Sequence, residues 1–334
     1  MPRSKRSRSL EYQLWYTIEN AYQKPGASKR AEMRANGGAG AKVYSNNYRG
    51  ELFKFGRGLA DFCRTQYPKA RLLSDITPNM VQEWLDSKGG VSPATAETYT
   101  SYLAKLCKVV NKTYKSAGWD FSGVSVPVDS QKAKQRTISW DEATLERLQE
   151  RVDAGRSRSA SRGLTFARIT GARVTEAASW VYEPSRVSWD GGRWGHGWIE
   201  IGKTDGAKGG RLRRVSLLNA QDSQKLRDLL QGMHPGERMT EYGGRTPGES
   251  LDRALRRGLD AIGVKDAKQN VTHSLRKGWA RRVYDATYEM ERANGQDPMD
   301  AHKKATETVN EELGHSKNRD DETEAYLNGY QRTD

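Results

Sequence analysis

The chain is poor in cysteine and contains no long apolar stretch. Its two cysteines, Cys63 and Cys107, are too few for a disulfide framework. Both lie in apolar helical stripes, so we expect reduced thiols and a cytoplasmic protein. No apolar run approaches the roughly 20 residues that a membrane-spanning helix needs. The first nine residues are basic, but no apolar segment follows them, which argues against a secretory signal.

Sequence signatures of two common kinds of site are also missing. The five histidines do not pair with one another or with a cysteine at the spacing of zinc ligands, so no metal site is expected. The glycine-rich segment 206–210 lacks the Gly-x4-Gly-Lys-Ser/Thr pattern of a phosphate-binding loop, which argues against an NTPase.

Positive charge, in contrast, is abundant. Lys and Arg outnumber Asp and Glu by 56 to 42, and a net charge of +14 is typical of a protein that binds a polyanion. About half of this excess lies in residues 1–49, which contain ten basic and three acidic residues. Because residues 1–43 are rich in Gly, Ser and Asn, we expect a basic flexible arm there, with at most a short helix at 10–21. A disordered tail without a partner is the alternative.

Residues 44–121 have the pattern of a small helical bundle. Apolar residues recur at helical spacing over 52–62. Thr-Pro at 77–78 and Ser-Pro at 92–93 each provide an N-cap followed by a first-turn proline, so each begins a helix. We therefore expect an N-terminal helical domain.

A linker and a mixed second domain should follow. Residues 122–137 combine Gly, Pro and Ser with a basic run, which is typical of a linker. A capping box at Ser139 and Glu142 begins the next helix, in a domain that spans 138–334. Short strands at 198–201 and 212–217 predict a β-hairpin around a turn-rich loop. The expected fold class is mostly α with a small β-hairpin or sheet, so the second domain is α+β, with further helices at 220–231, 249–262 and 272–290.

Four short motifs follow one another in this second domain, with a tyrosine after them. They are Thr170-Gly-Ala-Arg173-Val-Thr-Glu176, Lys203 in the predicted hairpin, His273-Ser-Leu-Arg276 and Leu313-Gly-His315-Ser, and the tyrosine is Tyr326. Each motif alone is weak evidence, since an Arg-x-x-Glu pair is usually a surface ion pair. Their order and separation on a basic background favour a functional site.

The side chains in these motifs suit chemistry on a phosphodiester. Guanidinium groups are permanently charged and planar, so Arg173 and Arg276 could hold the non-bridging oxygens from two sides. Glu176 lies three residues after Arg173, at a spacing that lets it orient this arginine. His273 could take a proton or bind the phosphate, and His315 could donate a further hydrogen bond. A lysine on a hairpin could protonate a leaving oxygen.

In this order, the motifs resemble those of the tyrosine recombinase family of phage and mobile-element integrases. The segment 46–95 resembles the helical core-binding domain of the family, and 139–334 resembles the catalytic domain. The resemblance implies a site-specific recombinase that integrates or excises a mobile element. Such enzymes cut and rejoin double-stranded DNA through a 3′-phosphotyrosyl intermediate, with no ATP, metal or other cofactor. It also implies a homo-tetramer on two DNA sites, and leaves open an accessory DNA-bending protein.

The resemblance assigns roles residue by residue. By resemblance, Arg173 is the first catalytic arginine, which Glu176 supports, and Lys203 is the hairpin lysine. His273 and Arg276 are the His-x-x-Arg pair. His315 is the second histidine, and Tyr326 is the nucleophile. Lys208 in the same loop is an alternative to Lys203. Tyr330 is an alternative to Tyr326, which the context Glu-Thr-Glu-Ala-Tyr-Leu favours. Between Arg276 and His315 lie 38 residues, more than the family usually shows, which indicates an insertion around 285–310.

DNA contacts are expected from basic residues of the arm, the linker, the hairpin and the helix that carries His273. These are Arg3, Lys5, Arg6, Arg8, Lys132, Lys134, Arg136, Arg211, Arg213 and Lys277. Two other functions fit the same composition. One is a non-catalytic DNA-binding or architectural protein, which would not require the nucleophile. The other is a type IB topoisomerase, against which the preceding helical domain argues.

Overall fold

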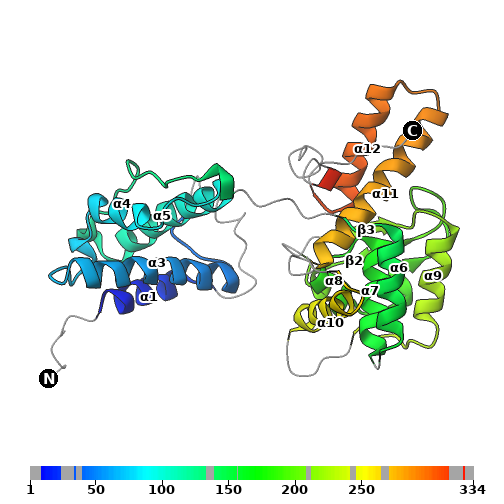
Figure 1. Ribbon diagram of the computed structural model, residues 1–334, viewed down its shortest axis with the longest axis horizontal. Coiled ribbons are helices and arrows are strands. Elements are labelled where there is room, and N and C mark those ends of the chain that lie inside the picture. Colours follow the sequence, from blue (N-terminus) through cyan, green and yellow to red (C-terminus); the bar gives the residue numbers. More distant parts are fainter. Residues whose placement is uncertain are drawn as a thin grey trace. The chain divides into compact units, whose positions relative to one another are not determined.

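The computed structural model describes residues 9–23, 34, 40–132, 139–155, 157–207, 212–240, 246–264, 271–315 and 326–327. The chain divides into two units, Met1–Gln135 and Arg136–Asp334 (Figure 1). The described residues are mainly helical with one small antiparallel sheet, as predicted. Within these residues, no helix is long and apolar enough to cross a membrane.

The first unit is a helical bundle. It contains α1 (Leu10–Ala21), α3 (Asn46–Gln66), α4 (Pro78–Asp86) and α5 (Pro93–Thr113), with short 3-10 turns at Leu73–Asp75, Lys115–Ala117 and Ser130–Lys132. The side chains of Thr77 and Ser92 accept hydrogen bonds from backbone amides three residues on, and prolines follow them, so both predicted helix starts are confirmed. The core of this unit includes Leu52, Leu59 and Trp84.

The short helix that the sequence allowed at 10–21 is present as α1, but it belongs to this bundle, so the prediction of a flexible arm over 1–43 is wrong for this part. Leu10, Leu14 and Ile18 recur every fourth residue, which gives the helix one apolar stripe. All three are buried in the core of the first unit, mainly against α3 and α5. Residues 1–8, 24–33 and 35–39 lie outside the described part of the chain.

The first part of the predicted linker also packs on the first unit. Val128 forms a β-bridge with Val91, and the amide of Ser125 donates to the side chain of Gln82 at 2.9 Å. Lys132 donates to the carbonyl oxygens of Gly89 and Gly90. The linker prediction is therefore wrong for 122–132, while 133–138 lie outside the described residues.

The second unit combines helices with one small sheet, which α12 contacts at β3. Its helices are α6 (Glu142–Asp153), α7 (Arg158–Thr170), α8 (Val174–Ser179), α9 (Ala220–Leu230), α10 (Pro247–Ala261), α11 (Val271–Ala293) and α12 (Pro298–Glu312). The antiparallel sheet has the order β1 (Val187–Ser188), β2 (Trp198–Ile201) and β3 (Arg213–Ser216). In its register, Trp198 pairs with Ser216 and Ile201 with Arg213. The predicted hairpin and its three flanking helices are thus confirmed, with bounds that differ by at most three residues.

The start of α6 differs from the prediction. Asp141 is its N-cap, and the carboxylate accepts from the amide of Thr144 at 2.7 Å. Ser139 instead receives a hydrogen bond from Arg281 of α11. The predicted capping box at Ser139 and Glu142 is therefore wrong, because a nearer carboxylate caps the helix and a tertiary contact occupies the serine.

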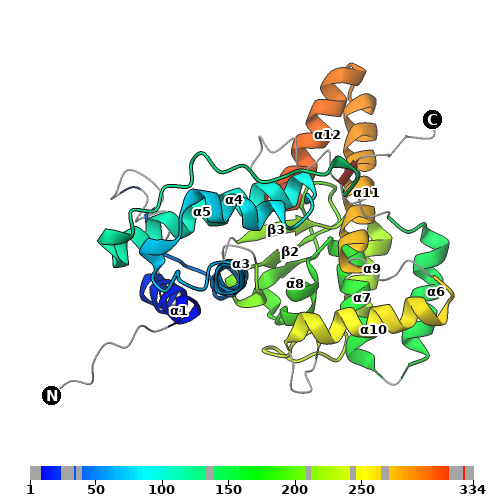
Figure 2. The ribbon, with the colours of Figure 1, turned by 60° about the vertical axis from the view of Figure 1, so that its left-hand side comes forward.

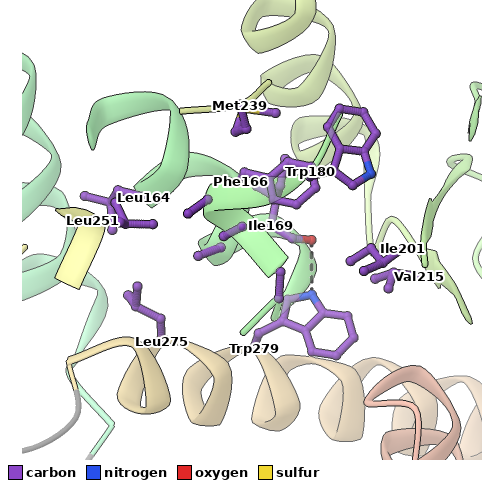
Figure 3. Packing of buried hydrophobic residues seen from close by; sticks show 14 of the residues in the cluster. Leu164, Phe166, Ile169, Trp180, Ile201, Val215, Met239, Leu251, Leu275 and Trp279 are labelled. Carbon is purple, nitrogen blue, oxygen red and sulfur yellow. Dashed lines mark hydrogen bonds between the residues drawn. The ribbon is translucent and has the colours of Figure 1, made fainter. Parts of the chain in front are cut away.

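Helix α7 lies in the core of the second unit. Its residue Phe166 packs on Trp180, with ring centroids 5.0 Å apart. On another side, the indole of Trp279 in α11 donates to the carbonyl of Ile169 at 3.1 Å (Figure 3). Both tryptophans are buried. This packing fixes the end of α7, where the first motif begins.

Helices α11 and α12 form a helical hairpin that extends beyond the remaining helices of this unit, as Figures 1 and 2 show. The polar stretch that predicted an insertion is the turn of this hairpin, where Gly295 has φ +83°. At the far side from this turn, α11 begins with the His273 motif and α12 ends just before His315.

Candidate active site

The Thr-Gly-Ala-Arg motif is a tight turn between α7 and α8. Gly171 ends α7 in the left-handed conformation, with φ +58°. A Cβ atom at this position would lie 2.3 Å from Cε3 of Trp279, so both the backbone and the packing require glycine. Arg173 is then the N-cap residue of α8.

Arg173 is oriented by Glu176. The backbone amide of Arg173 donates to Oε2 of Glu176 at 2.7 Å, and its Nη1 donates to Oε1 at 2.8 Å. The Arg173 side chain is 29% exposed, whereas that of Glu176 is 0% exposed. The carboxylate therefore fixes an arginine whose outer part still reaches solvent.

Arg213 supplies the main counter-charge of the buried Glu176. Its Nη1 and Nη2 donate to the two carboxylate oxygens at 2.8 and 2.7 Å. Burial alone would raise the pKa of Glu176, but the bond to Arg213 and the charges of Arg213, Arg173 and Arg276 outweigh it and lower the pKa to about 2. Glu176 is thus ionised at neutral pH.

The prediction that Arg213 contacts DNA is therefore wrong. Its side chain is 7% exposed, because alternation along β3 turns it inward with Val215. Arg214 points the other way, with its side chain 67% exposed and its guanidinium 4.3 Å from the centre of the Trp198 ring.

Arg276 joins three distant segments of this unit. It is 1% exposed. Its Nη1 donates to the carbonyl of Gly171 at 2.6 Å, its Nη2 to the carbonyl of Leu313 at 2.7 Å, and its Nε to the hydroxyl of Tyr326 at 3.3 Å. Burial lowers the pKa of this guanidinium to about 10, so it stays protonated at neutral pH.

Two histidines lie beside Tyr326. The ring of His273 is 5.2 Å from the Tyr326 ring, and that of His315 is 5.9 Å from it, between centroids. His273 keeps part of its surface exposed, but the burial of the rest lowers the pKa of its ring. The positive charges of Arg276, Arg173 and Lys277 lower this pKa further. A neutral His273 ring at pH 7 can accept a proton. Tyr326 itself is 8% exposed.

The turn that carries His315 is anchored to β3. Gly314 has φ +72°, and the amide of His315 donates to the carbonyl of Asn310 at 2.8 Å, which ends α12. The buried carboxylate of Glu312 accepts from the amide and hydroxyl of Ser216 at 2.8 and 2.9 Å. Burial raises the pKa of Glu312, although the hydrogen bonds from Ser216 and the charge of Arg193 lower it in part.

Lys203 is separated from the end of β2 by Gly202 and begins the 3-10 turn Lys203–Asp205. This turn contacts α8, the helix that Arg173 caps. The two alternatives that the sequence left open, Lys208 and Tyr330, lie outside the described residues.

Most of the other expected DNA contacts also fall outside the part of the chain that the structure describes. They are Arg3, Lys5, Arg6, Arg8, Lys134, Arg136 and Arg211. Lys132 is described, and its side chain is 52% exposed beside Asp129. Lys277 is only 4% exposed. Its prediction as a DNA contact is wrong, because its position on α11 turns inward.

Sequence reasoning missed the residues that support the motifs. Arg213 shares its strand face with Val215 and Leu217, so period-two alternation could have placed it inside. Glu312 has no comparable pattern, because its partner Ser216 is 96 residues away. In the described ranges, no group of three His, Cys, Asp or Glu side chains is placed to hold a metal ion.

No protein-family model and no curated protein matches this sequence. Among solved structures, the chain is similar to the XerH site-specific recombinase bound to a palindromic difH substrate, with 15% identity, a TM-score of 0.58 and coverage of 98% of this chain and 95% of that one. It is also similar to a lambda integrase tetramer bound to a Holliday junction, with 14% identity, a TM-score of 0.58 and coverage of 99% and 81%. A dimer of lambda integrase residues 75–356 on a core site gives 14% identity, a TM-score of 0.57 and coverage of 91% and 95%. Over nearly its whole length, the chain thus has the fold of the tyrosine recombinases.

Proposed function

We propose that the chain is a site-specific DNA recombinase that integrates or excises a mobile element through a phosphotyrosine intermediate. One observation carries this proposal. The buried Arg276 donates to the turn before Arg173, to the turn before His315 and to the hydroxyl of Tyr326. Two guanidinium groups, two imidazoles and a phenol are therefore gathered at one place, although they come from segments far apart in the sequence.

This arrangement suits the charge that develops on a phosphodiester under attack. Arg173 is held by Glu176 yet reaches solvent, so it can meet a non-bridging phosphate oxygen. Arg276 is fixed before substrate arrives, so it does not have to reorganise during the reaction. Preorganised donors of this kind are each worth about 10²–10³ in rate.

The proposed cleavage step conserves atoms and charge. The Tyr326 oxygen attacks the phosphorus, the bond from phosphorus to the 5′ oxygen breaks, and a 3′-phosphotyrosyl ester forms. The phenolic proton passes to His273, and the ammonium of Lys203 gives a proton to the leaving 5′ oxygen. In the rejoining step, a 5′ hydroxyl attacks the ester and the phenol is restored, so no ATP is consumed.

The proposed partners follow from the fold relatives and from charge. The XerH structure is a post-cleavage complex with its substrate, and the lambda integrase structure is a tetramer on a Holliday junction. We infer that four copies of this chain assemble on two duplex sites. The first unit would act as the core-binding domain and the second unit as the catalytic domain.

Covalent capture tests the proposal. The protein would be incubated with duplexes from the DNA that flanks its gene, each nicked near the cleavage point. Cleavage then releases a short fragment that carries the 5′ hydroxyl, and its loss prevents resealing. The wild-type protein should form an adduct at one recurrent DNA position, and peptide sequencing should place it on Tyr326. Tyr326→Phe should abolish the adduct, while the matched Tyr330→Phe should retain it.

Other outcomes would revise the assignment in distinct ways. An adduct on Tyr330 would keep the reaction and replace the nucleophile. Absence of any adduct would favour a protein that only binds DNA. Multiple-turnover relaxation of a plasmid without the site would favour a topoisomerase.

A further inference from the structure

The turn that carries Lys203 is built on a buried carboxylate that the proposed chemistry does not use. Asp205 is 0% exposed. Its Oδ2 accepts from the amide of Gly202 at 2.7 Å, and its own amide donates to the carbonyl of Gly202 at 3.1 Å. Because Gly202 immediately precedes Lys203, both bonds fix the backbone from which Lys203 projects.

Arg186, at the end of the 3-10 turn Pro184–Arg186 before β1, binds this carboxylate. Its Nη1 donates to Oδ1 of Asp205 at 3.1 Å, and its Nη2 forms a second bond with Oδ2. The same guanidinium also donates to the carbonyls of Val181, at 3.0 Å, and Glu200, at 2.8 Å. The Arg186 side chain is 14% exposed. A buried ion pair is weak evidence for stability, but a well-bonded one specifies a single conformation.

The turn Lys203–Asp205 also contacts α8, the helix that Arg173 caps. Gly206, directly after Asp205, has φ +76°. A Cβ atom there would lie 2.7 Å from Cγ2 of Thr175 in α8, so the backbone approaches that helix closely. Thr175 lies between Arg173 and Glu176 in the sequence. The turn that carries Lys203 therefore packs against α8, the same helix that Arg173 caps.

We propose that Asp205, held by Arg186, is a positioning residue that sets where Lys203 meets the leaving 5′ oxygen. This inference rests on the proposed function. Lysine has a flexible four-carbon stem, so the place of its ammonium depends on where its backbone is held. A misplacement of about 1 Å can cost about 10²-fold in rate.

The role can be isolated by changing the leaving group. During cleavage, Lys203 transfers one proton to the 5′ oxygen as the bond from phosphorus to that oxygen breaks. If sulfur replaces this bridging oxygen, the leaving thiolate needs no proton, because thiols ionise near pH ~8.5 whereas water ionises near ~15.7. A defect in proton delivery should disappear with the sulfur substrate. A defect in phosphate binding or in folding should persist.

The experiment measures single-turnover adduct formation by the full chain on nicked oxygen and sulfur duplexes from the flanking DNA. Asp205→Asn should slow cleavage of the oxygen substrate by about 10–100-fold and return to within about threefold of the wild type on the sulfur substrate. Lys203→Ala should show the same pattern. Arg173→Lys should be slow on both substrates. Glu200→Gln, which alters a carboxylate on β2 that is 24% exposed and does not bond to Asp205, should match the wild type on both.

The outcomes separate this inference from the proposed function. Asp205→Asn that is equally slow on both substrates would overturn the positioning role, and so would unchanged cleavage of the oxygen substrate. If Asp205→Asn does not fold, Arg186→Lys keeps the charge, loses the forked donors and is expected to give the same pattern. An unaffected Lys203→Ala would overturn the inference by removing the proton donor. Failure of the wild type to form any adduct would overturn the proposed function itself.

Discussion

Replacing Arg213 with methionine should destabilise the second unit far more than the same replacement of Arg214, its neighbour on β3. Arg213 binds both oxygens of Glu176, whose side chain is 0% exposed. The pKa of Glu176, about 2 against an ordinary 4.5, corresponds to roughly 3 kcal/mol of stability near neutral pH. Removal of one partner from a buried pair typically costs about 3–5 kcal/mol, because the other charge is left buried. We expect a loss of this size for Arg213→Met.

The pH dependence of this loss has a definite sign. The pKa of Glu176 is depressed in the folded wild type, so its contribution is present above about pH 4.5 and is lost as the pH falls toward about 2. Without Arg213, burial should raise the pKa of Glu176, and protonation then relieves the penalty. The difference between wild type and Arg213→Met should therefore be smaller near pH 4.5 than near neutral pH.

Urea unfolding at both pH values, followed by hydrogen exchange in peptides of α8 and β3, measures this difference. Arg214→Met is the matched control, because its side chain is 67% exposed and its pair with Glu200 spans 3.9 Å. It should cost at most about 0.5 kcal/mol. A loss below about 1 kcal/mol for Arg213→Met, or one that does not shrink on acidification, would refute this account of Glu176.

Three further predictions concern the turn, the base and the nucleophile. Gly171→Ala should cost about 3 kcal/mol or more in thermal unfolding of the second unit, because it adds a clash with Trp279 to the strain of a positive φ. Gly118→Ala, with the same φ of +58° and no neighbour within 4 Å, should cost only about 1 kcal/mol in the first unit, and equal losses would contradict the clash. The single-turnover cleavage rate should fall on acidification only below the ordinary histidine pKa of 6.5, because the pKa of His273 is lowered, and His273→Gln should remove this limb of the profile. A midpoint above 6.5 would exclude His273 as the base. Adduct formation should vanish in Tyr326→Phe and persist in Tyr330→Phe, as peptide mapping would show.

Local patterns were sufficient to predict much of the fold. The Thr-Pro and Ser-Pro pairs begin α4 and α5, because capping involves only the next few residues. Where two local patterns compete, the sequence alone does not decide. Ser139 and Asp141 are both good caps for α6, and a contact from Arg281, 142 residues away, occupies the serine. For α1, the sequence allowed the helix itself, but the polar composition of the surrounding residues concealed that its apolar side packs into the bundle.

The motifs named the side chains of the candidate site but, apart from Glu176, which orients Arg173, not the residues that hold them. The contacts of Arg276 with Gly171 and Leu313 span 105 and 37 residues, so no spacing rule reaches them. Arg213 was a different case, since its inward position follows from alternation along β3. Basic composition led to its prediction as a DNA contact, although a buried carboxylate needs a partner as much as a phosphate does.

The helical hairpin of α11 and α12 has a mechanical consequence for the two histidines. His273 lies at the start of α11 and His315 follows the end of α12, while the turn at Gly295 closes the hairpin. That turn is roughly 25 Å along α11 from Arg276 at 1.5 Å per residue. Both imidazoles are thus carried by two helices that pack on each other along their length. A molecule that bound at the distant turn and shifted the hairpin would act on both histidines, whereas the bonds between Glu312 and Ser216 and from Arg276 to Gly171 would resist that shift.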